Sequence, residues 1–455
     1  MRKLMITMVA ALALPAAVSA QGQTSVDSRV PSALVEQATE LNFWQQLGDT
    51  TLNRLIAEVQ RANLDVRAAE ARVSGARSNR TRAALDLAPT ATFRGGYSRQ
   101  RLSSATFPGS SGVFPDQNVW DAGFDASWEL DVFGRIRRNM QAQGALVEFA
   151  EEDRRDVLVS LTAELARAYF QLRGAQEQLN VAQKNADNQR HTLSLTQERL
   201  DAGRGSAFDT ERARAQLNTT LASIPSREAE VAAAQYRIGV LVGRSPVVVA
   251  RELNDTVGIP PLPVVTEIIN PDSVIRNRPD IAAAERLTAA QHALVGAAKA
   301  DYLPRLTIGG RAGYTTSEFH SLGDQGTWRY AVGPVITWEA FNLGRVKTNV
   351  SLYQAREEEA RAQYNQAVLA ARQDVETALA RYKAGLNRVE RLEEASAASE
   401  HAAELARLRF TEGVADFLQV LDAERTQLES QDLLAQSRTD AATAYAALYK
   451  AVGGR

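Results

Sequence analysis

The side chains best suited to covalent chemistry are scarce and scattered in this sequence. Cysteine is absent, so neither a disulfide nor a thiolate metal site can form. The four histidines have no metal-ligand spacing, and we expect each to be a surface residue: His191, His292, His320 and His401. No nucleophile–base cluster, phosphate-binding loop or zinc motif is present. The sequence therefore predicts no enzyme, no metal site and no cofactor, and a net charge of −2 argues against a nucleic-acid binder.

Leu418, Asp422 and Arg425 could act on ions without any covalent step. Their spacing of i, i+4 and i+7 places all three on one face of a helix. From the residues alone, Asp422 and Arg425 predict an ordinary surface ion pair, worth about 0.2–0.5 kcal/mol. Whether these three residues do more than this depends on the strands and helices that position their helix.

Four segments alternate between apolar and polar residues with a period of two, which predicts four β-strands. These segments lie near 90–99, 119–131, 305–315 and 328–341. In the second segment, Trp120, Phe124 and Trp128 share one face. Four acids occupy its other face: Asp121, Asp125, Glu129 and Asp131.

Two environments suit such strands, and the pattern leaves both open. They could be half-buried strands of a soluble sheet. They could also belong to a transmembrane barrel, in which apolar residues face lipid and polar residues face a water-filled lumen. Four tryptophans at the strand ends fit the aromatic girdle of a barrel: Trp120, Trp128, Trp328 and Trp338. In that case the four acids would favour cations in the lumen.

The number of strands adds a condition to the barrel interpretation. Four strands cannot close a barrel, since about eight is the practical minimum. Open sheet edges are not tolerated in lipid. A membrane barrel therefore requires several copies of the chain to pool their strands.

A tandem duplication organises the whole chain. Gly134 in the stretch FGRI recurs as Gly344 in LGRV, 210 residues later, and Gly203 recurs as Gly413 at the same offset. Pro89 recurs as Pro304 at an offset of 215, so one short insertion separates the two registers. Each half predicts the same order of elements: a helix, two strands, one very long helix, a tight turn and a return helix.

The long helices are predicted at 137–202 and 346–412, with return helices at 209–241 and 416–452. Shorter helices are predicted at 53–84 and 281–300, before the strands. The long segments are rich in strong helix formers, and their length of about 100 Å implies coiled-coil packing with a partner. Pro225 predicts a break or kink in the first return helix.

The first residues have the pattern of an export signal. Arg2 and Lys3 precede an apolar run of about fifteen residues that ends at Val18-Ser19-Ala20, which predicts a signal peptide over 1–20. This run is too short to span a bilayer, and no other segment comes close to the length required. The predicted division is then a first repeat at 21–250, a linker at 251–280 and a second repeat at 281–455.

Five stretches resemble the outer-membrane efflux channels of the OprM and NodT type and, more distantly, TolC. They are FWQQLGDTTLNRLIAEVQRANLDVRAAEARV, SWELDVFGRIRR, RNRPDIAAAERL, DFLQVLDAERTQLES and LYKAVGGR, in the family's order. The resemblance implies an α+β membrane protein that forms a homotrimer. Each chain would give four strands to a 12-stranded β-barrel and long helices to a periplasmic α-helical barrel, with the linker in an equatorial region.

The resemblance also implies a function and partners. The chain would be the outer-membrane exit duct of a Gram-negative tripartite efflux system for small molecules. Its partners would be a periplasmic adaptor and an inner-membrane pump of the resistance-nodulation-division class. The alternatives are a duct for protein secretion, as in the TolC branch, and an envelope coiled-coil scaffold without a channel. Many similar proteins carry a lipidated cysteine; here Gln21 would be the first mature residue, and the barrel alone would provide the anchor.

Two sets of residues match functional positions of the family. Leu418, Asp422 and Arg425 match the periplasmic aperture, where three copies would form an apolar constriction and a carboxylate ring, two usual ways to gate a pore. The two turns between the long helices and the return helices match the tips that dock the adaptor: Gly203, Gly205, Ser206, Gly413, Val414 and Ala415. On their own residues, these glycines predict only helix ends.

Overall fold

The computed structural model describes residues 43–103, 115–265 and 271–454. The predicted signal peptide at 1–20 lies outside these residues. Within the described ranges, no helix combines the length and the apolar character needed to cross a membrane.

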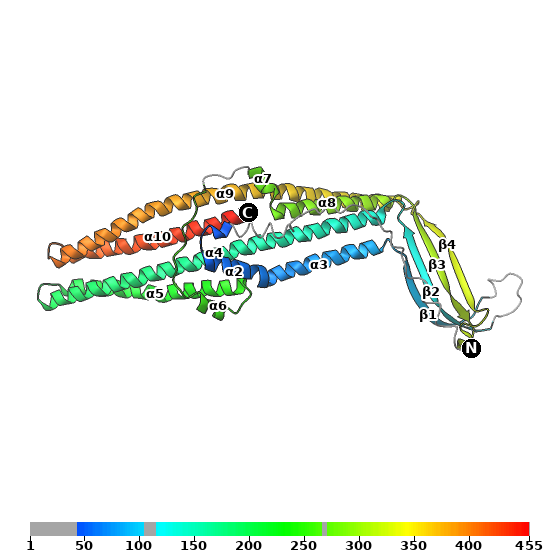
Figure 1. Cartoon of the computed structure of the whole chain (residues 1–455), viewed down its shortest axis with the longest axis horizontal. Coiled ribbons are helices and arrows are strands. Elements are labelled where there is room, and N and C mark those ends of the chain that lie inside the picture. Colours follow the sequence, from blue (N-terminus) through cyan, green and yellow to red (C-terminus); the bar gives the residue numbers. More distant parts are fainter. Residues whose placement is uncertain (1–42, 104–114, 266–270, 455) are drawn as a thin grey trace, which may run out of the picture.

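The protein is a long bundle of helices with a β-sheet at one end, set at an angle to the bundle (Figure 1). The sheet has four antiparallel strands in the order β1-β2-β3-β4. These are β1 (Thr90–Gln100), β2 (Gln117–Leu130), β3 (Arg305–Thr316) and β4 (Trp328–Thr337), with a short 3-10 helix, η2 (Phe319–Ser321), between the last two. All four segments with period-two alternation are therefore strands, and β1 and β4 are the two edges of this sheet.

Two very long helices form the body of the bundle. They are α4 (Arg135–Asp201, 67 residues) and α9 (Leu343–Thr411, 69 residues). Near the sheet they pack against α3 (Leu64–Leu85) and α8 (Pro279–Ala300), and toward the opposite end against α5 (Ala207–Leu241) and α10 (Phe417–Ala451). Each long helix thus has partners along its length, as its size requires.

The two halves of the chain repeat one another element by element. The return helices α5 and α10 have 35 residues each and begin 210 positions apart. The helices α3 and α8 have 22 residues each and begin 215 positions apart, the second of the two offsets seen in the sequence. One chain therefore consists of two structurally equivalent halves in tandem.

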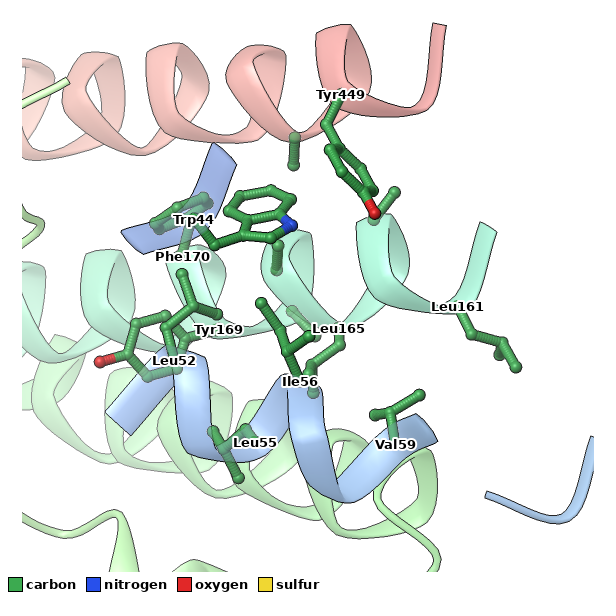
Figure 2. Packing of buried hydrophobic residues seen from close by; sticks show 14 of the residues in the cluster. Trp44, Leu52, Leu55, Ile56, Val59, Leu161, Leu165, Tyr169, Phe170 and Tyr449 are labelled. Carbon is green, nitrogen blue, oxygen red and sulfur yellow. The ribbon is translucent and has the colours of Figure 1, made fainter. Parts of the chain in front are cut away.

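The main core lies about halfway along the bundle. Trp44 is fully buried, with its ring centroid 4.8 Å from that of Tyr449 in α10 and 6.5 Å from that of Phe170 in α4. Leu52 and Ile56 of α2 (Thr50–Ala62) complete this packing (Figure 2). The segment just before α2 is thereby fixed between the two halves.

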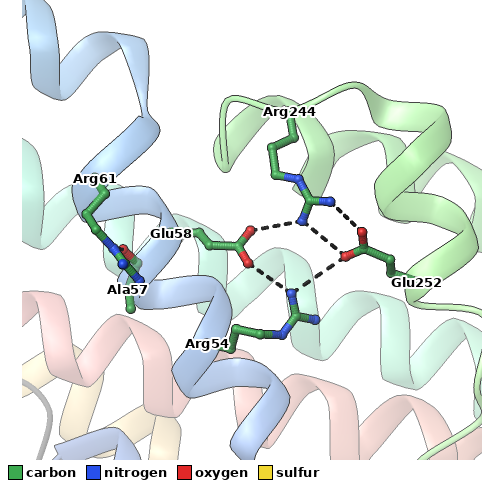
Figure 3. A network of polar contacts seen from close by, with 6 residues as sticks. All are labelled: Arg54, Ala57, Glu58, Arg61, Arg244 and Glu252. Atoms are coloured by element: carbon green, nitrogen blue, oxygen red, sulfur yellow. Dashed lines mark hydrogen bonds and ion pairs between the residues drawn. The ribbon is translucent and has the colours of Figure 1, made fainter.

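An ion-pair network holds α2 to the short helix α6 (Pro246–Glu252). Arg54 and Glu58 of α2 contact Glu252 of α6 and Arg244, which lies between α5 and α6 (Figure 3). The Arg54–Glu58, Arg244–Glu58 and Arg54–Glu252 distances are 2.9, 3.2 and 3.6 Å. The helix α7 (Pro271–Arg276) then leads into α8.

Three details differ from the sequence prediction. The helix expected at 53–84 is two helices, because Asn63 has an extended backbone and its side chain accepts hydrogen bonds from Asp65 and Val66 as the N-cap of α3. Pro225 does not break α5, which is helical from Ala207 to Leu241. The strand expected at 328–341 ends at Thr337, so Trp338 follows β4.

Candidate functional site

One face of the sheet is apolar and exposed on the single chain. Phe93 and Phe124 lie opposite each other across β1 and β2, with ring centroids 5.4 Å apart, and both are exposed. Tyr330, Val332 and Ile336 continue this face on β4, each more than 70% exposed. So large an apolar surface requires a cover other than water.

The four tryptophans lie at the two ends of the sheet. Trp120 and Trp328 are near its outer end, and Trp128 and Trp338 are near the helices. The indole N–H of Trp128 donates to the carbonyl of Leu87 at 2.8 Å, and that of Trp338 donates to the carbonyl of Tyr302 at 3.1 Å. The duplication thus repeats one tryptophan anchor at the junction of sheet and helices. Assignment of these residues to a membrane girdle stays a prediction.

The three acids of β2, and Asp131 directly after it, do not stand as free negative charges, because each pairs with an arginine. Asp121 pairs with Arg329, and Asp125 lies 3.4 Å from Arg94. Glu129 pairs with Arg135 at 2.8 Å and Asp131 with Arg137 at 3.1 Å. The expectation of a cation-favouring barrel interior rested on the acids alone and left out the arginines that pair with them.

Asp131 also joins the sheet to α4. Its carboxylate accepts hydrogen bonds from the backbone N–H groups of Ile136 and Arg137, both at 2.9 Å. Burial alone would raise the pKa of Asp131, but the hydrogen bonds from Arg137 and Ile136 hold that pKa below its usual value. A charged carboxylate therefore caps the helix that carries the chain away from the sheet.

Leu418, Asp422 and Arg425 lie on one exposed face near the start of α10. The side chain of Leu418 is 52% exposed, and the two charged residues are exposed as well. In the described part of the chain, neither Asp422 nor Arg425 has an ion-pair or hydrogen-bond partner for its side chain. The predicted i, i+3 pair is not formed, and a role for these residues as an aperture stays a prediction.

The opposite face of α10 carries a buried polar contact that sequence reasoning missed. Glu424, whose side chain is 4% exposed, accepts a hydrogen bond from Thr192 of α4 at 2.7 Å and lies 3.2 Å from Arg407 of α9. This carboxylate joins three helices close to the candidate aperture. The sequence signal was weak, since Glu424 occurs in a charged stretch of a surface-like helix.

The two turns at the far end of the bundle are closed by glycines. Gly203 and Gly413 have φ of +70° and +76°, which favours glycine. Beyond them, Arg204 N–H donates to Arg199 O and Val414 N–H donates to Arg409 O, a Schellman ending on both long helices. A Cβ on Gly205 would lie 2.7 Å from Leu200 N, so this turn admits no larger residue without movement.

The return helices begin directly after these turns. Ser206 caps α5 by accepting a hydrogen bond from Phe208 N–H at 3.2 Å, and Asp416 caps α10 by accepting one from Gln419 N–H at 3.1 Å. Val414 is 68% exposed at the tip. The tips are thus compact ends of helical hairpins, and their docking to an adaptor stays a prediction.

Comparison with known proteins decides the family. The model of the family described as "Outer membrane efflux protein" matches residues 55–244 and 270–454. The chain belongs to the outer membrane efflux protein family. It is 30% identical over 431 residues to the pyoverdine export outer membrane protein OpmQ of Pseudomonas putida, covering 93% of this chain and 90% of OpmQ.

Other relatives agree over similar lengths. The chain is 27% identical to the probable outer membrane lipoprotein SilC of Salmonella typhimurium, over 97% of this chain and 93% of SilC. Its structure matches the outer-membrane channel OprN with a TM-score of 0.84 and 38% identity, covering 91% of this chain and 92% of OprN.

Family membership confirms the predicted function and place. The protein is an outer-membrane exit duct for efflux rather than an enzyme, and its helices extend into the periplasm.

Proposed function

We propose that three copies of this chain form one duct, with a 12-stranded β-barrel in the outer membrane and an α-helical barrel in the periplasm. The observation that carries the proposal is a four-stranded sheet with two unpaired edges and an exposed aromatic face. A barrel built from several copies pairs the edges and places the aromatic face in lipid. Each repeat, 21–250 and 281–455, gives two strands, and 251–280 links the repeats in the equatorial region.

The polar face of the sheet then lines the lumen, and the four tryptophans lie at the two membrane interfaces. The helices continue the duct for about 100 Å toward the tips, at 1.5 Å per residue. The exposed face of α10 with Leu418, Asp422 and Arg425 is the aperture. Three copies place Asp422 carboxylates near one another, and Arg425 offsets their repulsion from the neighbouring copy, since neither side chain has a partner among the described residues of its own chain.

The tips at 203–206 and 413–415 dock a periplasmic adaptor, which links the duct to an inner-membrane pump of the resistance-nodulation-division class. Support for small-molecule cargo comes from relatives whose names specify pyoverdine export and toluene efflux, at 30% and 28% identity. These cargoes differ at nearly equal similarity, so cargo choice depends on more than the overall fold of the duct.

Single-channel conductance in planar bilayers tests the proposal. The wild-type trimer is expected to be mostly closed, and Asp422→Ala with Arg425→Ala is expected to raise its conductance several-fold, because the ring that holds the aperture is lost. Glu429→Ala, a charge removal on an exposed position of the same helix, is the matched control. Equal conductance in all three proteins would mean that the aperture is not formed by these residues. The lack of any current from folded trimers would favour a scaffold without a channel.

A further inference from the structure

The polar face of the sheet carries more positive than negative charge at mid-height. Three neighbouring cross-strand rows contain its charged residues there. In the first, Asp121 lies opposite Thr315; in the third, Asp125 lies opposite Arg311. In the row between them, Arg94 and Arg329 lie on the two edge strands. Three guanidinium groups and two carboxylates leave one positive charge in excess.

The pairing within these rows identifies the excess group. Asp121 accepts hydrogen bonds from Thr315, at 2.7 Å, and from Arg329. Asp125 lies 3.4 Å from Arg94 and, although it is opposite Arg311 in the register, forms no ion pair with Arg311. Arg311 is exposed, and within the described ranges its side chain has neither an ion pair nor a hydrogen bond. Both carboxylates are thus already compensated, and Arg311 remains available.

The rows on either side of Arg311 contain glycines, and the carboxylate opposite it, Asp125, pairs with Arg94. On the same face, the middle row has Gly123 and Gly313 as direct partners, and the row on the other side of Arg311 has Gly309 and Gly333. A Cβ on Gly313 would lie 2.5 Å from the carbonyl oxygen of Ala122, so glycine is required there. A guanidinium group over glycine backbone is open to a ligand from the lumen.

Guanidinium is the group that binds carboxylates and phosphates with two parallel hydrogen bonds. Copies of Arg311 at one height in a closed barrel converge on the same axis, and charges that line a water-filled channel add their potentials. We propose that Arg311, in three copies, forms an anion-binding ring inside the barrel that favours cargo bearing carboxylate or phosphate groups. The inference rests on the proposed trimeric duct.

Reversal potential under a KCl gradient measures the effect in single channels even at low conductance. Arg311→Gln is expected to shift the potential toward cation preference, and Arg311→Lys, which keeps the charge, is expected to leave it near the wild-type value. Arg99→Gln is the matched control, since it removes the same charge from β1 on the opposite face, where Arg99 pairs with Asp116 at 3.2 Å. Heat-dependent mobility on gels confirms that each variant forms the folded barrel.

Citrate provides a second readout when added from the barrel side, because it reaches Arg311 without passing the aperture. It is expected to block the current, and Arg311→Gln, which removes all three guanidinium groups, is expected to weaken that block by at least about tenfold, the effect of losing even one charge-assisted pair. Equal potentials and equal block in Arg311→Gln and wild type would overturn the anion ring while the current itself upheld the duct. The lack of current from every folded variant would overturn the duct, and the inference with it.

Discussion

Gly123 and Gly313 are the residues at which the sheet leaves no room for a side chain. A Cβ on either would lie 2.5 Å from a backbone oxygen of the facing strand. We therefore expect Gly313→Ala to destabilise the sheet by about 1–3 kcal/mol, the usual cost of overpacking. The measurement is the fraction of protein that reaches the heat-modifiable barrel form in the outer membrane.

Gly309→Ala is the control for this prediction. Gly309 lies on the same strand, but a Cβ there meets nothing within 4 Å. It should fold like the wild type. Equal yields of folded barrel from Gly309→Ala and Gly313→Ala would show that the close approach of β2 and β3 has no energetic consequence.

Asp156 of α4 gives the bundle a dependence on pH. Burial raises the pKa of this carboxyl, and nearby Asp280 raises it further, while Lys450 and Arg278 oppose the rise. The folded protein therefore binds this proton more readily than the unfolded chain. Stability falls as pH rises from the ordinary carboxyl pKa, about 3.9, through the raised folded pKa.

Asp156→Asn mimics the protonated form, so it should raise the apparent Tm by about 1–2 °C at pH 8 and by nothing near pH 4. Thermal melts of the purified protein at both pH values measure this. Asp153→Asn, one turn away, removes the partner of Arg72 at 2.6 Å and should give no rise at pH 8. A gain for Asp156→Asn that persisted at pH 4 would contradict the assignment to its charge.

The residues of the polar face show what a sequence can and cannot predict at this scale. Alternation alone placed Asp121 and Asp125 on the polar side of a strand. Their partners could not be predicted, because Arg329 is 208 positions from Asp121 and the contact depends on the register of three strands. In the segment 305–315 the apolar residues occupy even positions, so Arg311 belongs to the polar face. The sequence alone could therefore have placed Arg311 beside these acids.

Among the elements, α10 is attached by apolar packing along its length and, near its start, also by one buried carboxylate. Glu424 joins α10 to Thr192 of α4 and Arg407 of α9. Arg407→Ala would leave this charge buried with a single neutral donor, which we expect to cost about 1–3 kcal/mol. Hydrogen–deuterium exchange of the α10 amides measures the effect as faster exchange near Glu424.

Glu424→Gln should have a smaller effect on exchange, because an uncharged amide can still accept the Thr192 hydrogen bond. Arg391→Ala is the matched control on α9, since its pair with Glu394 is exposed on both sides. Similar exchange in Arg407→Ala and Arg391→Ala would mean that the buried contact does not hold α10 in place.

Elements were predicted well where one pattern ran for many residues. The strands and the long helices have periodic, uninterrupted sequences, and the repeat supplied each prediction twice. The errors occurred at single residues where tertiary contacts decide. Asn63 ends one helix and starts another because its amide also donates to Leu241 O at 2.7 Å, a contact 178 residues away.

Pro225 failed as a helix breaker for a related reason. Its ring removes the backbone hydrogen bond to Leu221 O, and the two hydroxyl bonds nearby, from Ser223 to Thr220 O and from Ser226 to Ser223 O (both 2.7 Å), do not replace it. Packing of α5 against α4 along its length outweighs the local preference. Local propensity could not reveal that balance.

At the scale of the whole molecule, the proposed trimer depends on pairing between β4 of one copy and β1 of the next. Within one chain, β1 and β4 are separated by two strands, or about 14 Å at 4.8 Å per strand. A disulfide requires Cα atoms within about 7 Å, so none can form between β1 and β4 of the same sheet. The natural chain has no cysteine, so an introduced pair reports without background.

Ala91→Cys on β1, combined in turn with cysteines at Tyr330, Val332 and Ile336 on β4, tests this closure. These positions share one face of the sheet, and the strand register fixes that assignment. Oxidation is expected to give dimers and trimers on a denaturing gel for at least one pair. Ala331→Cys with Ala91→Cys is the control. Ala331 lies on the other face of the sheet, so this double variant should stay monomeric on the gel. Monomers from every pair, in a protein that still conducts, would mean that copies do not meet edge to edge.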